Sequence, residues 1–143
     1  MPTRTAEAVW SGNITEGKGT IKTQSGVLAD KPYDWRSRSA DGPNTNPEEL
    51  LGAAHAGCYS MALSGALGKA GFTPTRVHTT AKVTFDKVGE GFAITKIELV
   101  NESTVPNLDE AKFMEFANGA KAGCPVSKAL TGTTISLSAK LVK

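Results

Sequence analysis

Two cysteines are the residues of this 143-residue chain best suited to covalent chemistry. Cys58 lies in a stretch rich in small apolar residues, and Cys124 stands directly before Pro125. A cysteine attacks as a thiolate, and at its free pKa of about 8.5 only a few per cent is ionised at neutral pH. A reactive cysteine therefore needs a cation or a dipole nearby. Both thiols could instead be inert, because free cysteine often packs as a small hydrophobe.

The local sequence favours Cys124 as the more acidic thiol. Pro125 suits the first position of a short helix, whose N-terminus would lower the pKa of Cys124, whereas apolar surroundings would raise that of Cys58. If Cys58 is the attacking residue, its cation must come from elsewhere. Arg36 and Arg38 are candidates, and a buried guanidinium would need Glu48 or Glu49 as its anion. The alternative is that none of these residues acts on a thiol. The two arginines would then lie on a solvated strand face, and the two glutamates would be ordinary acids in the first turn of a helix.

The elements expected to position these residues alternate between short strands and helices. Residues 45–49, Thr-Asn-Pro-Glu-Glu, combine an N-cap side chain, an early proline and two acids, which predicts a helix start. The expected order is βββ-α-ββ-α-α-β, which indicates a single α+β domain over residues 1–143 with an antiparallel sheet and a long central helix. The expected segments are strands near 6–10, 20–23 and 33–38, a helix from about 45 to 69, a hairpin of 77–88 and 92–105, helices at 108–122 and 125–130, and a closing strand at 135–141.

The long helix is expected to be buried. An apolar stripe along it contains Cys58, and its many glycines and alanines would let another backbone approach closely. The stripe consists of Leu51, Ala54, Cys58, Met61 and Gly65, alongside Leu50, Leu63 and Leu67.

Composition excludes several classes of function. The formal net charge is +2, with 16 basic and 14 acidic residues scattered along the chain, so a nucleic-acid partner is not expected. The N-terminal residues lack the apolar core of a signal peptide, and no apolar run approaches the roughly 18 residues of a membrane span. We therefore expect a cytoplasmic protein without a membrane partner, in which a bridge between the two cysteines would be transient.

Three other interpretations compete with thiol chemistry. His55, Cys58 and Cys124 could bind a metal, but His78 is the only other histidine and there is no paired C-x-x-C motif. Residues 68–71, Gly-Lys-Ala-Gly, match the G-x-x-G loop of KH-type RNA-binding domains, although a helix C-cap fits better because a strand follows. A non-enzymatic stress or scaffold protein with dormant cysteines is the third.

Several sequence runs together closely resemble the OsmC family, which belongs with the organic hydroperoxide resistance (Ohr) proteins. The resemblance covers nearly the whole chain, and both cysteine motifs, their separation and the Asn-Pro-Glu helix entry agree with it. The matching runs are Trp10–Gly12, Gly17–Thr20, Ser25–Leu28, Thr45–Leu50, Cys58–Leu63 and Lys121–Ser127.

The resemblance assigns a role to four residues. It implies that Cys58 is the peroxidatic cysteine and Cys124 the resolving cysteine, that Arg38 rather than Arg36 polarises the thiol, and that Glu48 holds the arginine. The implied chemistry, in oxidative or osmotic stress defence, is reduction of an organic hydroperoxide to an alcohol through a Cys58 sulfenic acid and a Cys58–Cys124 disulfide.

The resemblance also implies the partners. The disulfide would be reduced by an external dithiol of lipoyl or thioredoxin type, without metal, haem or flavin. The protein would be an intertwined homodimer with active sites at the subunit interface. Glu48 and Cys58 lie ten residues apart on one predicted helix, or about 15 Å along its axis. We therefore expect Arg38 and Glu48 of one chain to approach Cys58 of the other, the alternative being an arginine that bridges the gap within one chain.

Overall fold

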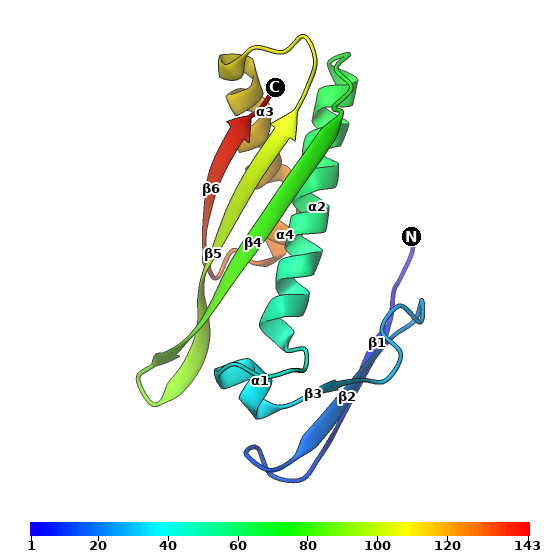
Figure 1. Ribbon diagram of the computed structural model, residues 1–143, viewed down its shortest axis with the longest axis vertical. Helices are drawn as coiled ribbons and strands as arrows, with labels where there is room; N and C mark the ends of the chain where they lie inside the picture. Colours follow the sequence, from blue (N-terminus) through cyan, green and yellow to red (C-terminus); the bar gives the residue numbers. More distant parts are fainter. The chain divides into compact units, whose positions relative to one another are not determined.

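The computed structural model describes residues 1–143 and divides them into two compact units, Met1–Leu50 and Leu51–Lys143. The elements confirm the predicted α+β class, with one helix more than expected (Figure 1). No helix is long and apolar enough to cross a membrane.

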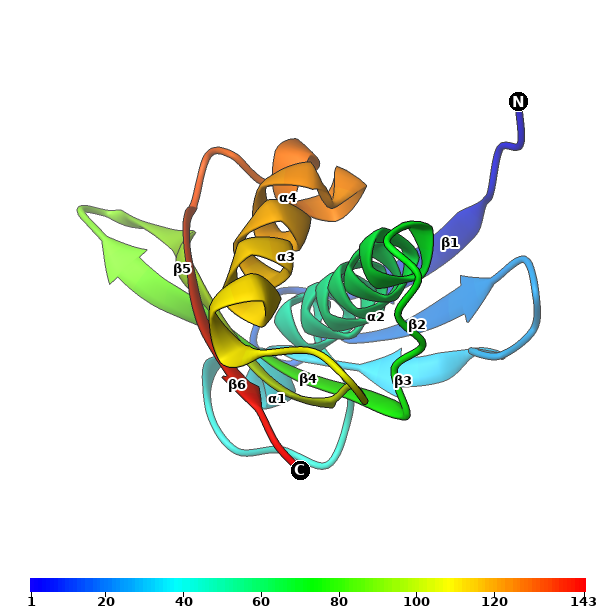
Figure 2. The same ribbon diagram turned by 90° about the horizontal axis from the view of Figure 1, so that it is seen from above.

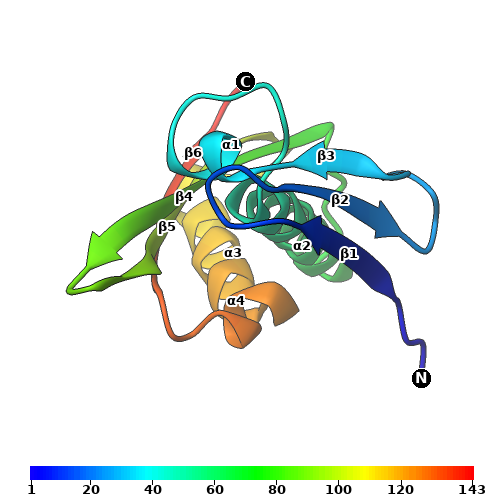
Figure 3. The ribbon, with the colours of Figure 1, turned by 90° about the horizontal axis from the view of Figure 1, so that it is seen from below.

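The first unit contains a three-stranded antiparallel sheet, in the order β1 (Ala6–Ser11), β2 (Lys18–Thr23) and β3 (Lys31–Tyr33) (Figure 3). Trp10 and Tyr33 both pair with Gly19, one from each side. Their rings meet over this glycine, with centroids 5.4 Å apart. A Cβ at residue 19 would collide with both rings, so the aromatic pair requires glycine there.

The prediction of a strand over residues 33–38 is wrong after Tyr33. Asp34 caps a short helix, α1 (Trp35–Ser39), by accepting a hydrogen bond from the Ser37 backbone N–H at 2.8 Å. Over only five residues, the alternation of polar and apolar side chains is compatible with a strand or with one turn of helix. The Asp34 carboxylate favours the helix because it caps the first turn. Arg36 and Arg38 therefore lie on a helix.

The long helix α2 (Pro47–Lys69) begins and ends as predicted, with Asn46 capping it through the Glu49 N–H. Its buried stripe contains Leu63 and Leu67 of the predicted one but otherwise differs from it. Gly52, His55, Tyr59, Leu63 and Leu67 are buried, whereas Met61 is 77% exposed. The rest of this stripe was not predicted because glycine, histidine and tyrosine are not strong indicators of the buried face of a helix.

The second unit is built on the sheet β4-β5-β6, made of β4 (Arg76–Val88), β5 (Gly91–Thr104) and β6 (Thr134–Leu141). The predicted hairpin is confirmed, with a register shift between Thr84 and Phe85. The expectation of a wholly antiparallel sheet is wrong at β6, which runs parallel to β5. The cause is the helical crossover between them, α3 (Glu110–Gly123) and α4 (Pro125–Ala129), which returns the chain to the starting end of β5.

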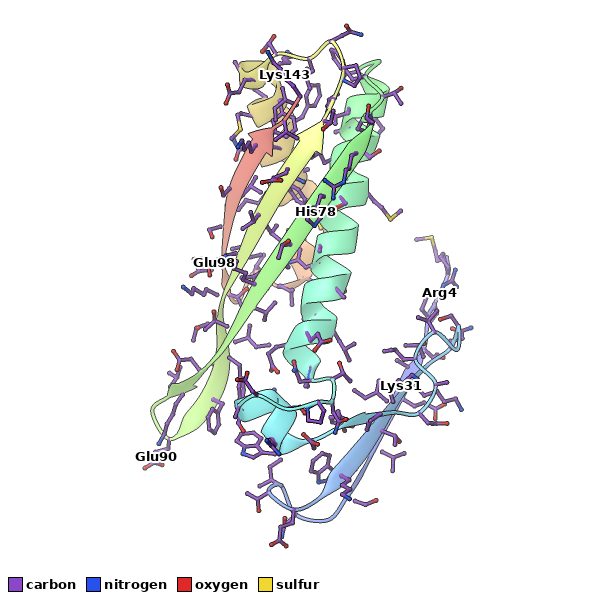
Figure 4. The ribbon with its side chains drawn as sticks, viewed as in Figure 1. Arg4, Lys31, His78, Glu90, Glu98 and Lys143 are labelled. Carbon is purple, nitrogen blue, oxygen red and sulfur yellow. The ribbon has the colours of Figure 1, made fainter.

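Helices α2 and α3 lie side by side on one face of this sheet (Figure 2). The core between them and β5 is closed, since Leu63, Ile97 and Phe113 are fully buried. The Tyr59 hydroxyl donates to the Ala117 carbonyl at 3.1 Å, which ties α2 to α3. The other sheet face is open: His78 on β4 is exposed, and Glu90 lies at the β4–β5 turn (Figure 4).

Candidate active site

The two cysteines lie next to each other in the second unit. Cys58 stands midway along α2, and Cys124 occupies the junction between α3 and α4. The thiols are free and within hydrogen-bonding reach of one another. Cys58 is half-buried whereas Cys124 has no exposed surface, so a molecule arriving from solvent reaches Cys58 first.

The surroundings within this unit favour negative charge on Cys124. Burial and the neighbouring Cys124 thiol raise the pKa of Cys58, and the Val126 backbone N–H opposes them only in part. Burial also disfavours the Cys124 thiolate, but hydrogen bonds from Cys58 and from the backbone and hydroxyl of Ser127 outweigh it and lower the pKa of Cys124. An attack by Cys58 therefore requires a cation beyond these groups.

A buried histidine and serine extend the thiol cluster. His55 is fully buried, and its Nε2 lies 2.7 Å from Ser127 Oγ. Sequence reasoning considered His55 only as a metal ligand and missed Ser127. The spacing offered a signal, since His55 precedes Cys58 by three residues and Ser127 follows Cys124 by three, and both spacings put two side chains on the same helix face.

Arg38 and Glu48 form an ion pair in the first unit. The Arg38 Nε and Nη2 both donate to Glu48 Oε1, at 3.1 and 2.9 Å. The Glu48 side chain is only 8% exposed, and its Oε2 is buried without a hydrogen-bond partner. Arg36 and Glu49, the alternative candidates, are exposed. The structure thus brings together the four predicted site residues as two pairs, one pair in each unit.

A polar network fixes the helix that carries Arg38. Ser37 is buried and its hydroxyl accepts the Asn44 N–H at 3.0 Å, while its carbonyl accepts the Asn46 side-chain amide at 2.8 Å. Asp34 accepts from the Asn44 side chain at 2.7 Å. The Ser37 backbone N–H and the Asn44 amide hold the pKa of Asp34 below its usual value, so this cap is ionised at neutral pH.

A small pocket of about 70 Å³ lies beside Arg38 in the same unit. Its apolar wall consists of Trp10, Ile14, Tyr33, Trp35 and Pro47. Sequence reasoning did not identify this pocket, because it depends on the register that brings Trp10 and Tyr33 together across Gly19.

The sequence motifs behind two rival interpretations have structural roles. His55 hydrogen-bonds Ser127, and His78 is exposed on β4. No group of three or more histidine, cysteine, aspartate or glutamate side chains is placed so that it could hold a metal ion. The G-x-x-G run closes α2: Phe72 N–H bonds to the Leu67 carbonyl at 2.9 Å, and Gly71 has a positive φ of 89°. The helix C-cap interpretation is confirmed.

Comparisons with known proteins identify the family of this chain. Residues 40–138 match the family model "OsmC-like protein". The chain is 56% identical to Peroxiredoxin OsmC of Escherichia coli over 87% of each chain. It is 31% identical to an organic hydroperoxide resistance protein of Xanthomonas axonopodis pv. citri, over 65% of this chain and 64% of that protein.

A solved structure extends the similarity to the fold. The crystal structure of the organic hydroperoxide resistance protein OhrB of Bacillus subtilis superposes with a TM-score of 0.70 at 26% identity. The match covers 94% of this chain and 97% of that one. The chain therefore belongs to the OsmC family of thiol-dependent peroxidases.

Proposed function

We propose that this chain reduces organic hydroperoxides to alcohols, with Cys58 as the attacking residue and Cys124 as the resolving one. The observation that carries the proposal is the adjacent thiol pair with unequal exposure. Cys58 thiolate attacks the outer peroxide oxygen, releases the alcohol and becomes a sulfenic acid. Cys124, sheltered from solvent, then attacks the Cys58 sulfur and forms the disulfide. An external dithiol, of lipoyl or thioredoxin type, reduces it through a mixed disulfide.

Arg38 supplies the cation that the thiol unit lacks. A guanidinium stabilises the Cys58 thiolate and the negative charge that develops on the departing alkoxide. Glu48 accepts two hydrogen bonds from Arg38 through one oxygen, which fixes the direction of the guanidinium plane. Because Glu48 is nearly buried, this orientation is held more rigidly than a surface ion pair would hold it.

We propose that Arg38 and Glu48 act on Cys58 of a second copy of the chain. Support comes from the face of α2 that the second unit leaves uncovered, where Ala54, Gly57, Met61 and Gly65 are exposed. A Cβ on Gly57 or Gly65 would meet nothing within 4 Å in the chain, so a partner backbone can approach closely there. A symmetric dimer built on this face would contain two complete sites, each drawing on both chains. In this assembly residues 1–143 act as one functional domain in the cytoplasm.

The aromatic pocket beside Arg38 supports an organic rather than an inorganic peroxide. Trp10, Tyr33 and Trp35 offer apolar surface to an alkyl or aryl group, which hydrogen peroxide lacks. Ile14, on the pocket wall, is 56% exposed, so its side chain can be changed with little risk to folding.

Steady-state rates with cumene hydroperoxide and hydrogen peroxide, using dithiothreitol and a monothiol as donors, test the proposal. We expect the dithiol to support turnover better, and the organic peroxide to be preferred. Ile14→Ser should lower kcat/KM for cumene hydroperoxide about fivefold, roughly the effect of losing one apolar contact, and leave hydrogen peroxide unchanged. Val27→Ser, at another exposed apolar residue of the same unit, is the matched control. No consumption of either peroxide would refute the function.

A further inference from the structure

The pairing of His55 with Ser127 is unusual because the imidazole is buried with one partner only. Nε2 lies 2.7 Å from Ser127 Oγ, and Nδ1 is buried without any hydrogen-bond partner. The proposed function gives no step to either residue, although Ser127 lowers the pKa of Cys124. A buried polar group of this kind carries a desolvation cost that apolar residues at the same positions would avoid.

The unpartnered Nδ1 fixes the direction of the hydrogen bond. Burial lowers the pKa of His55, so the ring is neutral at neutral pH and carries one hydrogen. If that hydrogen were on Nδ1, it would be an orphaned buried donor, which is rarer in proteins than an unsatisfied acceptor. We therefore assign the hydrogen to Nε2, which donates to Ser127 Oγ.

This assignment leaves the Ser127 hydroxyl hydrogen available for another acceptor. Ser127 stands one turn into α4, three residues after Cys124, a spacing that puts the two side chains on one helix face, and Ser127 is one of the groups that lower the pKa of Cys124. Both residues are closed to solvent, Cys124 fully and Ser127 at 5% exposure. A buried thiolate has no water to solvate it, so this hydroxyl is one of the few groups able to stabilise it.

We propose that Ser127 donates a hydrogen bond to Cys124 Sγ during disulfide formation, and that His55 is a positioning residue which holds the Ser127 hydroxyl in that direction. The inference rests on the proposed function, in which Cys124 attacks the Cys58 sulfenic acid. It assigns this pair to the second chemical step alone.

The step balances without any further reactant. The Cys124 thiolate attacks Sγ of the Cys58 sulfenic acid, an S–S bond forms, and the S–O bond breaks. The Cys58 sulfur is reduced and the Cys124 sulfur is oxidised by the same amount. The leaving hydroxide takes up the proton that the Cys124 thiol released on ionisation, and water departs.

A single-turnover experiment separates the two steps. Reduced protein is mixed with one equivalent of cumene hydroperoxide without reductant, quenched in acid at intervals, and analysed by mass spectrometry for sulfenic acid, trapped by dimedone, and for disulfide. Ser127→Ala should form the sulfenic acid at the wild-type rate but the disulfide about tenfold more slowly, as expected for loss of a hydrogen bond to a charged group. Ser60→Ala, which removes a hydroxyl bonded to Thr79, is the matched control and should change neither rate.

The role of His55 is tested by a double-mutant cycle. His55→Leu should slow disulfide formation in the wild-type background but have no further effect when Ser127 is already alanine. His55→Gln, which keeps an N–H donor, should retain the wild-type rate. An unchanged sulfenic acid rate shows in each variant that the thiol unit is folded.

Two results would overturn the inference, and they are distinguishable from failure of the proposed function. Disulfide formation at the wild-type rate in Ser127→Ala would remove the role of the hydroxyl. Equal slowing by His55→Leu in both backgrounds would show that His55 does not act through Ser127. If the wild-type protein forms no Cys58–Cys124 disulfide, the proposed function itself fails, and the inference fails with it.

Discussion

The two units of the chain differ in the reactive groups that they contain, a guanidinium in one and two thiols in the other. The unit Met1–Leu50 contains a fixed guanidinium, the Arg38–Glu48 pair, beside an aromatic pocket, but it has no cysteine. The unit Leu51–Lys143 contains both thiols, and the groups that shift the pKa of Cys58, namely Cys124 and Val126, belong to it and carry no positive charge. A thiolate needs a cation or a set of hydrogen-bond donors, so the first unit offers what the second lacks.

The difference explains why inspection of Cys58 alone suggests an unreactive thiol. Burial raises its pKa, while neighbouring Cys124 receives the stabilising hydrogen bonds. Within its own unit Cys124 is therefore the more acidic residue, yet it has no exposed surface. Under the proposed function, Cys58 becomes reactive only when Arg38 lies beside it.

The largest expected effect comes from removing the attacking sulfur. Cys58→Ser should reduce peroxide consumption to the background rate of the buffer, because a hydroxyl has too high a pKa to supply the attacking anion. The Arg38–Glu48 pair lies in the other unit and should be unaffected. Substantial turnover by this variant, with Ser60→Ala as a folding control, would show that the thiol unit does not carry the chemistry.

Mixing inactive subunits tests whether the Cys58 thiol and the Arg38 guanidinium of one active site come from different chains. Cys58→Ser and Arg38→Ala proteins are each expected to be impaired alone. After subunit exchange, half of the dimers are mixed and each contains one complete site, so activity should recover to about a quarter of the wild-type value. The check is a peroxidase assay before and after exchange, with each variant exchanged against itself as control. A site built within one chain predicts no recovery.

A smaller effect concerns the charge of the histidine beside the thiols. Burial lowers the pKa of His55 below its unfolded value of about 6.5, so the unfolded chain binds a proton that the folded chain does not. Stability should therefore be complete above about pH 6.5 and fall as the pH drops below it, by at most about 1.4 kcal/mol per pH unit.

Urea unfolding at pH 7.5 and 5.5 measures this slope. His55→Gln should flatten it, because the variant has no imidazole at residue 55 to take up the proton. The same slope in wild type and His55→Gln would mean that His55 can carry a positive charge when folded. His55 would then be a local cation for the thiols, and the contrast between the two units would weaken.

The sequence predicted the elements with strong local signals. Asn46, Pro47 and the two following acids marked the start of α2, and Pro125 marked that of α4, because capping and proline geometry depend on adjacent residues only. The α1 helix was missed since its cap, Asp34, also fits a strand alternation. The parallel pairing of β6 was missed because pairing direction depends on the path of the crossover rather than on the strand's own residues.

The candidate site shows the same division between local and long-range information. The roles of the four site residues were assigned from resemblance to the OsmC family. Local chemistry alone would have chosen Cys124, and it could not distinguish Arg38 from Arg36. The His55–Ser127 contact joins residues 72 apart in the sequence. The two i, i+3 spacings could associate each residue with its own cysteine, but not the two residues with each other.

Under the proposed function, Arg38 of the first unit lowers the pKa of Cys58 in the second. The most direct measurement is the rate of Cys58 alkylation by iodoacetamide as a function of pH, in a Cys124→Ser background so that a single thiol reports. Arg38→Ala should raise the Cys58 pKa by about one unit or more, each unit corresponding to about 1.4 kcal/mol of lost thiolate stabilisation, and Arg36→Ala should shift it less. A curve that Arg38→Ala leaves unchanged, or that Arg36→Ala shifts further, would rule out Arg38 as the group that lowers the pKa of Cys58.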